Sequence, residues 1–187
     1  MTGQLDGKRI LILATNGFEQ SELEVPRDRL KSAGAAVDIV SPEAGEIKGW
    51  DKTDWGRPVK VDKKLSDARM ADYDAIVLPG GVLNPDHLRV NSDVLELIRG
   101  FFDAGKTVAA VCHAPWLLVE AGIAKDRKMT SFNSIKTDVI NAGAKWEDSA
   151  VVADNGVVTS RNPGDLDAFV AKIIEEIKEG QHQRRAA

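Results

Sequence analysis

Four short apolar runs, separated by stretches with helical periodicity, constrain the fold of this chain more than any other feature. Each run is almost uninterrupted by polar residues, which is typical of parallel strands covered on both faces. A strand, a helix and a second strand in this order form a right-handed crossover with parallel strands. The sequence therefore predicts an α/β fold, a three-layer αβα sandwich with a mainly parallel central sheet. The runs are residues 10–14, 37–40, 75–78 and 108–111.

Helix signals fill most of the intervening sequence. Glycine commonly follows the last turn of a helix, and several of the apolar periodic stretches here end in one. The expected caps are Asn16 or Ser21 for the first helix, Asn91 or Ser92 for the second, and Asp165 for the last. The expected helices span residues 22–33, 93–102, 116–121, 135–142 and 166–177.

Three segments lie outside this alternation. Residues 42–65 are polar and turn-rich, and their end alternates as a half-exposed strand does, which predicts a small β-hairpin excursion. We assign its Trp50 and Trp55 to a subunit interface in preference to a satellite cluster. Residues 128–132 are expected to form a strand. Residues 151–160 contain an Asp-Asn-Gly turn and predict an antiparallel hairpin at one edge of the sheet.

Composition narrows the class of protein. With 187 residues we expect one domain over 1–187, with a frayed tail at 181–187. The 25 basic and 29 acidic residues give a net charge of −4, which argues against a specific nucleic-acid site. We expect neither a secretory signal nor a membrane span. The single cysteine is compatible with a reducing cytoplasm, and the three histidines lack metal-ligand spacing, so neither metal nor cofactor is expected.

That cysteine, Cys112, follows the apolar run 108–111 at a predicted strand-to-helix turn. The small residues Ala110 and Ala114 flank it, and Pro115 suits a first helical turn. A sharp turn of this kind exposes the nucleophile of hydrolases, and a helix N-terminus would favour the thiolate. On this feature alone, a buried and inert cysteine is the competing interpretation.

Candidate partners of this thiol follow other strands at the same predicted edge. The backbone N–H groups of His113 and of Gly80-Gly81 are candidates for an oxyanion hole. His113 itself is a candidate general base or a structural side chain. Acidic candidates for acid/base work are Glu19, Glu22 and Asp86, although the first two would also suit the first turn of a helix.

Four motifs together resemble one known family, and the resemblance extends from about Arg9 to Ile177. The chain closely resembles the PfpI-type intracellular cysteine proteases and protein deglycases, within the class I glutamine amidotransferase-like superfamily that includes the parkinsonism-associated deglycase. The resemblance implies a flavodoxin-like fold and assembly into homodimers or hexamers. The motifs are GFEQSELEVP (17–26), DAIVLPGG (74–81), AVCHAP (110–115) and TDVINAG (137–143).

The resemblance also implies roles for individual residues. Cys112 matches the family's nucleophile, Glu22 the glutamate that hydrogen-bonds it, and Glu19 a second acidic position. His113 matches the triad histidine, and Asp86 falls where the neighbouring subunit contributes an acid, usually Glu, on a loop one residue shorter. Phe132 stands where many members carry Tyr near the cysteine, and it lacks the hydroxyl that could protonate a substrate.

Three functions remain open on this evidence. The first is a stress-protective, cofactor-free deglycase or glyoxalase that acts through Cys112 on methylglyoxal, glyoxal and their adducts with protein or nucleotide. The second is an intracellular peptidase with an intersubunit Cys112-His113-Asp86 triad. The third is a thiol oxidation sensor or holdase without turnover. A glutaminase subunit is disfavoured, because the only later histidine, His182, lies in the tail.

Overall fold

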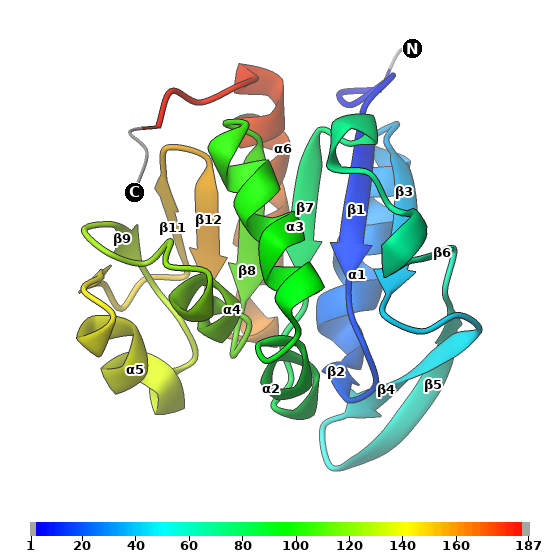
Figure 1. Ribbon diagram of the computed structural model, residues 1–187, viewed down its shortest axis with the longest axis horizontal. Coiled ribbons are helices and arrows are strands. Elements are labelled where there is room, and N and C mark those ends of the chain that lie inside the picture. The colour runs from blue at the N-terminus through cyan, green and yellow to red at the C-terminus, as the bar shows by residue number, and fades with distance from the viewer. Residues whose placement is uncertain (1–2, 185–187) are drawn as a thin grey trace.

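The computed structural model describes residues 3–184, which form a three-layer αβα sandwich (Figure 1). Seven strands make the central sheet in the order β11-β12-β8-β7-β1-β3-β6. All neighbouring pairs are parallel except β11 with β12. The parallel strands β3, β1, β7, β8 and β12 follow the flavodoxin-like order 2-1-3-4-5. The predicted fold class is therefore confirmed.

The strands and helices have the following bounds. The strands are β1 Arg9–Leu13, β2 Phe18–Glu19, β3 Ala36–Ser41, β4 Glu46–Asp51, β5 Asp54–Lys60, β6 Lys63–Lys64, β7 Ala75–Leu78, β8 Thr107–Val111, β9 Lys128–Met129, β10 Lys145–Trp146, β11 Val151–Asp154 and β12 Val157–Ser160. The α-helices are α1 Gln20–Ser32, α2 Leu83–Leu88, α3 Ser92–Asp103, α4 Pro115–Glu120, α5 Lys136–Asn141 and α6 Leu166–Glu179. Short 3-10 turns are η1 Leu65–Asp67, η2 Met70–Asp72, η3 Asn133–Ile135 and η4 Pro163–Asp165.

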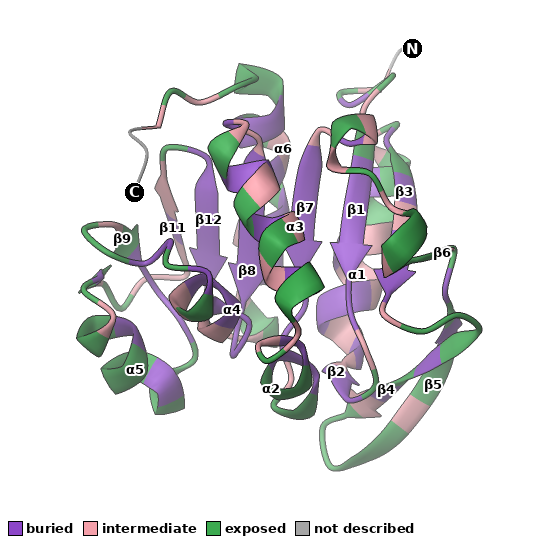
Figure 2. Cartoon of the chain, in the orientation of Figure 1, coloured by how far each residue is buried: buried purple, intermediate pink, exposed green. Residues whose placement is uncertain are grey.

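Each face of the sheet has its own hydrophobic core. Helices α1 and α6 cover one face, and α3 and α4 cover the other (Figure 1). Strand residues alternate between the two cores, so Ile10 and Ile12 pack with α1 and α6 while Leu11 and Leu13 pack with α3. The central strands are therefore buried along almost their whole length (Figure 2), which explains their unbroken apolar sequence.

Several local predictions differ from the structure. Asn91 caps α3 as predicted, with its side chain accepting from the N–H groups of Asp93 and Val94. By contrast, Asp165 makes no capping hydrogen bond, and the first helix begins after Glu19 and not after Asn16 or Ser21. The strand predicted over 128–132 is only two residues long and pairs with β10 in a separate sheet. No helix in the described residues is long and apolar enough to cross a membrane.

Both predicted hairpins are present. The turn-rich segment 42–65 contains the antiparallel pair β4–β5. Strand β4 also pairs with β2, which gives a separate three-stranded sheet. Trp50 and Trp55 meet edge to face, with ring centroids 5.5 Å apart, and Trp55 is 45% exposed. Their place in a subunit interface stays a prediction. The edge hairpin β11–β12 matches the sequence expectation.

Residues 181–184, within the predicted frayed tail, make hydrogen bonds to the body of the domain. The His182 backbone N–H donates to the carbonyl of Gly105 at 2.8 Å. The Arg184 guanidinium donates to the carbonyls of Phe102 and Asn155 at 2.6 and 2.7 Å. Residues 181–184 therefore lie against the body of the domain, and residues 185–187 of that prediction lie outside the described residues.

Candidate active site

Cys112 occupies a sharp turn directly after β8. Its φ of 64° lies in the left-handed region, which costs an ordinary residue of order 1 kcal/mol or more. The turn is held from two sides, because the Cys112 N–H donates to Ser160 in β12 and its carbonyl accepts from the N–H of Phe132. The predicted strand-to-helix turn is therefore present at Cys112, but the residue is buried, with 5% exposed, and not exposed as the sequence predicted.

Glycine is required where the β7 loop passes this cysteine. A Cβ on Gly80 would lie 2.7 Å from the Cys112 Cβ and 2.5 Å from the Glu22 Oε2. Gly81 has a φ of 75° and lies against the backbone of residues 17–19, just before α1. The backbone N–H groups of Gly81 and His113 favour the Cys112 thiolate, whereas the Gly80 N–H is already donated to Glu22 at 2.9 Å. Of the two predicted oxyanion-hole glycines, Gly80 therefore has its N–H occupied by Glu22, whereas the Gly81 N–H acts on both the Cys112 sulfur and the Glu22 carboxylate.

Glu22 is fully buried in the first turn of α1, beside Cys112. Its Oε2 accepts the Gly80 N–H, while its Oε1 has no hydrogen-bond partner among the described residues. Burial raises the pKa of this carboxyl to about 8, and the hydrogen bonds from Cys112 and Gly80 only partly oppose this. Near neutral pH Glu22 is therefore mostly protonated and able to donate a proton beside the sulfur.

The resting thiol is protonated as well. Burial, and then the neighbouring Glu22, raise the pKa of the Cys112 thiol. The lowered thiol pKa that we expected from a helix N-terminus is therefore wrong. Helix α4 has only six residues, and its weak dipole does not compensate for the removal of the sulfur from water. Attack by Cys112 consequently needs a base within reach.

The candidate base is the next residue, His113. The Nδ1 of His113 lies 3.1 Å from the Cys112 Sγ, and its Nε2 lies 2.9 Å from the Oγ of Ser134. Burial lowers the pKa of His113, which keeps the imidazole neutral at pH 7. The Phe132 ring stacks on it with centroids 4.7 Å apart and planes inclined by 24°. A neutral, oriented imidazole therefore faces the thiol.

The remaining predicted site residues lie farther out. Glu19 is half-buried immediately before α1, where burial raises the pKa of its carboxyl. Asp86 is exposed on α2 and pairs with Arg89 of the same chain at 3.0 Å. Within one chain, Asp86 makes no hydrogen bond or ion pair with His113 among the described residues. An acid contributed by a partner subunit stays a prediction.

Two polar residues near the cysteine were not predicted from the sequence. Ser134 contacts His113, as described above. Asn84 is fully buried and ties the loops of the site together, because its amide donates to the carbonyls of Pro79 and Gly80 and its oxygen accepts from Thr15. The only sequence signal for Asn84 was a polar residue shortly after the Gly80-Gly81 pair.

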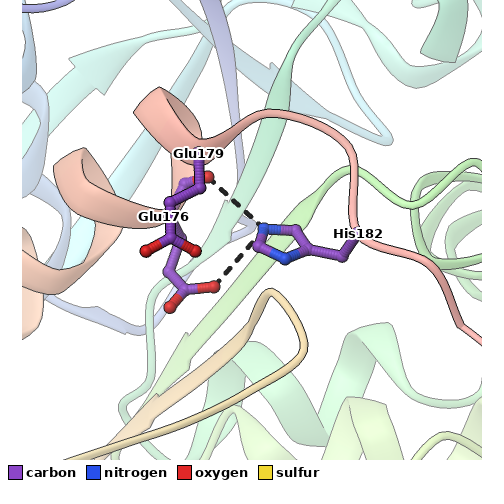
Figure 3. A group of neighbouring side chains, drawn as sticks. All are labelled: Glu176, Glu179 and His182. Atoms are coloured by element: carbon purple, nitrogen blue, oxygen red, sulfur yellow. Dashed lines mark hydrogen bonds and ion pairs between the residues drawn. The ribbon is translucent and has the colours of Figure 1, made fainter.

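A possible set of metal ligands lies at the opposite end of the sheet. Glu176, Glu179 and His182 place one ligand atom each within 4.8 Å of one another (Figure 3). The His182 Nε2 lies 3.4 Å from a Glu176 carboxylate oxygen and holds the tail to α6. These contacts occupy the histidine nitrogen and join the tail to α6.

The raised pKa of the buried Glu22 carboxyl should make the free energy of unfolding depend on pH. Its pKa of about 8 exceeds the ordinary value of 4.5, so the folded state binds more protons than the unfolded state between these values. The contribution of Glu22 to the free energy of unfolding is therefore greatest below pH 4.5 and is lost as the pH rises through 8. We expect Glu22→Gln to remove most of this fall, of the order of a few kcal/mol.

Urea unfolding at pH 5, 7 and 9 measures this effect. The matched control is Glu43→Gln, which removes an exposed carboxylate and should unfold with the pH dependence of the wild type. If Glu22→Gln also follows the wild-type pH dependence, Glu22 is ionised in the folded protein at neutral pH.

The chain is similar in sequence and in fold to known proteins. The model of the DJ-1/PfpI family matches residues 8–176. The chain is 43% identical to Deglycase PfpI of Pyrococcus furiosus, over 91% of this chain and 99% of that protein. It is 38% identical to the putative cysteine protease YraA of Bacillus subtilis, over 91% and 99%. The crystal structure of Drosophila melanogaster DJ-1beta superimposes with a TM-score of 0.82 at 29% identity, covering 92% of this chain and 94% of that one.

Proposed function

Because the chain belongs to the DJ-1/PfpI family, we propose that it is a cysteine-dependent, cofactor-free hydrolase of 2-oxoaldehydes and of their early adducts with protein or nucleotide. The observation that carries this proposal is the position of the Cys112 thiol, with the His113 imidazole 3.1 Å away and a buried Glu22 carboxyl beside it. One nucleophile, one base and one acid meet at this point. We further propose that it acts in the cytoplasm as a stress-protective enzyme.

In the proposed reaction, His113 and Glu22 transfer protons to and from the substrate while Cys112 is bound to it. His113 takes the thiol proton as the Cys112 sulfur adds to the aldehyde carbon of methylglyoxal, and Glu22 protonates the resulting alkoxide. The hydrogen on that carbon then leaves as a proton while the neighbouring ketone oxygen is protonated, which gives an enediol. The second carbon next gains a proton as the hydroxyl on the first carbon loses its own. The product is a lactoyl thioester, which water cleaves to lactate and the free thiol. The balance is one methylglyoxal and one water to one lactate.

Adducts of the aldehyde require one additional step before the same reaction. A hemithioacetal or an aminocarbinol releases its thiol or amine as the aldehyde carbon passes to Cys112. The name of the relative from Pyrococcus furiosus supports this extension. A homodimer or hexamer is the proposed assembly, and reactive carbonyl compounds are the proposed partners.

Formation of lactate from methylglyoxal tests the proposal. We expect purified protein to form lactate, and the same protein alkylated at its single cysteine to form none above the uncatalysed rate. Lactate is measured by NMR in a preparation freed of contaminating glyoxalases. Equal amounts of lactate from native and alkylated protein would exclude this function.

Peptide hydrolysis is a second candidate, favoured by the direct contact of His113 with Cys112. It would use Asp86 from a partner subunit as the third member of the triad. Asp86 pairs with Arg89 in its own chain, so this arrangement requires that pair to open. Cleavage of fluorogenic peptides by an assembled oligomer, lost in Asp86→Asn, would favour the peptidase over the deglycase.

A further inference from the structure

The end of helix α6 and the segment that follows it bring two carboxylates and one imidazole together. Glu176 and Glu179 lie one turn apart on α6, and the chain leaves the helix at Gly180 so that His182 faces them (Figure 3). One ligand atom of each side chain lies within 4.8 Å of the other two. The spacing of the histidines did not indicate this group, because two of its three members are glutamates. We propose that these three side chains bind one divalent cation, with Zn²⁺ as the preferred ion.

The distance between the histidine and the carboxylate fits a shared metal ion better than a direct hydrogen bond. The His182 Nε2 lies 3.4 Å from a carboxylate oxygen of Glu176 and 3.4 Å from the backbone carbonyl oxygen of the same residue. The heavy atoms of an N–H···O hydrogen bond are usually about 2.9 Å apart. Two ligands held at about 2.0 Å in tetrahedral Zn²⁺ coordination are about 3.3 Å apart. A cation between the nitrogen and the carboxylate therefore requires little movement of either group.

Contacts that do not involve the two glutamates hold the imidazole in place. The His182 N–H donates to the carbonyl of Gly105 at 2.8 Å. Gly105 and Gly156 have positive φ values of 71° and 77°, and a Cβ on either residue would overlap His182. Farther along the tail, the Arg184 guanidinium donates to three backbone carbonyls and makes no ion pair with the glutamates among the described residues. The ring is therefore positioned before an ion binds, which lowers the entropic cost of binding.

The charge of the three side chains also favours a cation. Glu176 is buried, with 8% of its surface exposed, and a buried carboxylate is destabilising unless an opposite charge lies close to it. A neutral His182 supplies no such charge, whereas one Zn²⁺ balances both carboxylates. Glu179 is exposed, so its side chain is free to rotate onto the ion and close the remaining distance.

The types of ligand atom select among cations. An imidazole nitrogen suits Zn²⁺ and other transition metals, whereas Ca²⁺ and Mg²⁺ are bound mainly by oxygen ligands. Three protein ligands leave the fourth position of a tetrahedral Zn²⁺ for water. His182 contacts Gly105, before β8 begins, whereas Cys112 follows the end of that strand. Zn²⁺ bound here would join residues 181–184 to α6 and stabilise the fold, separately from the proposed hydrolysis.

Titration of the full chain with Zn²⁺ tests the proposal. The protein is freed of metal with a chelator and carries no affinity tag, and Cys112→Ala is titrated beside the wild type to detect binding to the thiol. We expect calorimetry to show one Zn²⁺ per chain, with the same affinity in both proteins. Zn²⁺ at a hundredfold excess over its Kd should raise the midpoint of thermal unfolding by roughly 5 °C. Ca²⁺ at the same concentration should have neither effect.

Single substitutions distinguish this site from weak binding to an acidic surface. His182→Gln and Glu179→Gln each remove one ligand and should weaken Zn²⁺ binding at least about tenfold, since loss of a residue that only supports a metal ligand already has an effect of that size. Because Glu179 is exposed, its replacement should leave the fold intact. Glu175→Gln is the matched control, since Glu175 lies on the same helix and pairs with Lys172 at 2.7 Å. That variant should bind Zn²⁺ as the wild type does.

The NMR signals of the histidine rings give a structural readout of the same site. Of His87, His113 and His182, only His182 should shift when Zn²⁺ is added, and the spectrum of His182→Gln identifies its signals. Four results would each overturn the proposal: no Zn²⁺ binding by the wild type, loss of binding in Cys112→Ala, unchanged binding in His182→Gln and Glu179→Gln, or equal binding of Ca²⁺.

Discussion

Replacing Cys112 by alanine is expected to abolish lactate formation from methylglyoxal and to leave the fold intact. The substitution removes the atom that adds to the aldehyde, and loss of a nucleophile lowers the rate by a factor of about 10³ or more. Alanine adopts the φ of 64° at no greater cost than cysteine, since both are ordinary L-residues. The lost sulfur contacts should lower the free energy of unfolding by about 1 kcal/mol.

Lactate formation and urea unfolding of the same preparations measure the two effects. Cys112→Ser is the matched variant, because its hydroxyl preserves the shape of the side chain but is a far weaker nucleophile at the same position. It should be as inactive as Cys112→Ala. Lactate formation that persists in the folded alanine variant would show that Cys112 is not the nucleophile.

A methyl group at Gly80 is expected to disrupt both the site and the domain. The added Cβ would lie 2.5 Å from the Glu22 Oε2 and 2.7 Å from both the Cys112 Cβ and the Val111 carbonyl oxygen. None of these atoms is the free end of a flexible side chain, because Glu22 is fully buried and the others belong to the end of β8 and the turn that follows it. We expect a loss of about 3 kcal/mol in the free energy of unfolding.

The same displacement should cost activity. Moving Cys112 or Glu22 by about 1 Å is enough to lower a rate about 100-fold. Gly100→Ala is the control, because its Cβ would meet only Met70 side-chain atoms at 3.7 Å or more and lies inside α3. That change should be neutral or stabilising by up to about 1 kcal/mol. Gly80→Ala with wild-type stability and activity would contradict the close packing described here.

The sequence alone determined the architecture, because its evidence is local and repeated. Unbroken apolar runs at residues 10–14, 75–78 and 108–111 are typical of strands buried on both faces, and helical segments between them make those strands parallel. The turn at Cys112 follows from the same pattern, since the apolar run ends there and Pro115 begins a helix. Short elements such as β9 escaped this argument, because two residues carry no periodicity.

The chemistry of the site depended on the tertiary structure. Sequence adjacency did not establish that His113 would reach the Cys112 sulfur, because the side-chain directions depend on a left-handed φ at the turn. The raised pKa values of Glu22 and Cys112 come from complete removal from water, which elements distant in sequence bring about together. The contact of Ser134 with His113 could not be predicted for the same reason, because nothing near residue 134 in the sequence indicates an imidazole 21 positions earlier. Local patterns specify elements, whereas burial and contacts between distant residues decide protonation and reactivity.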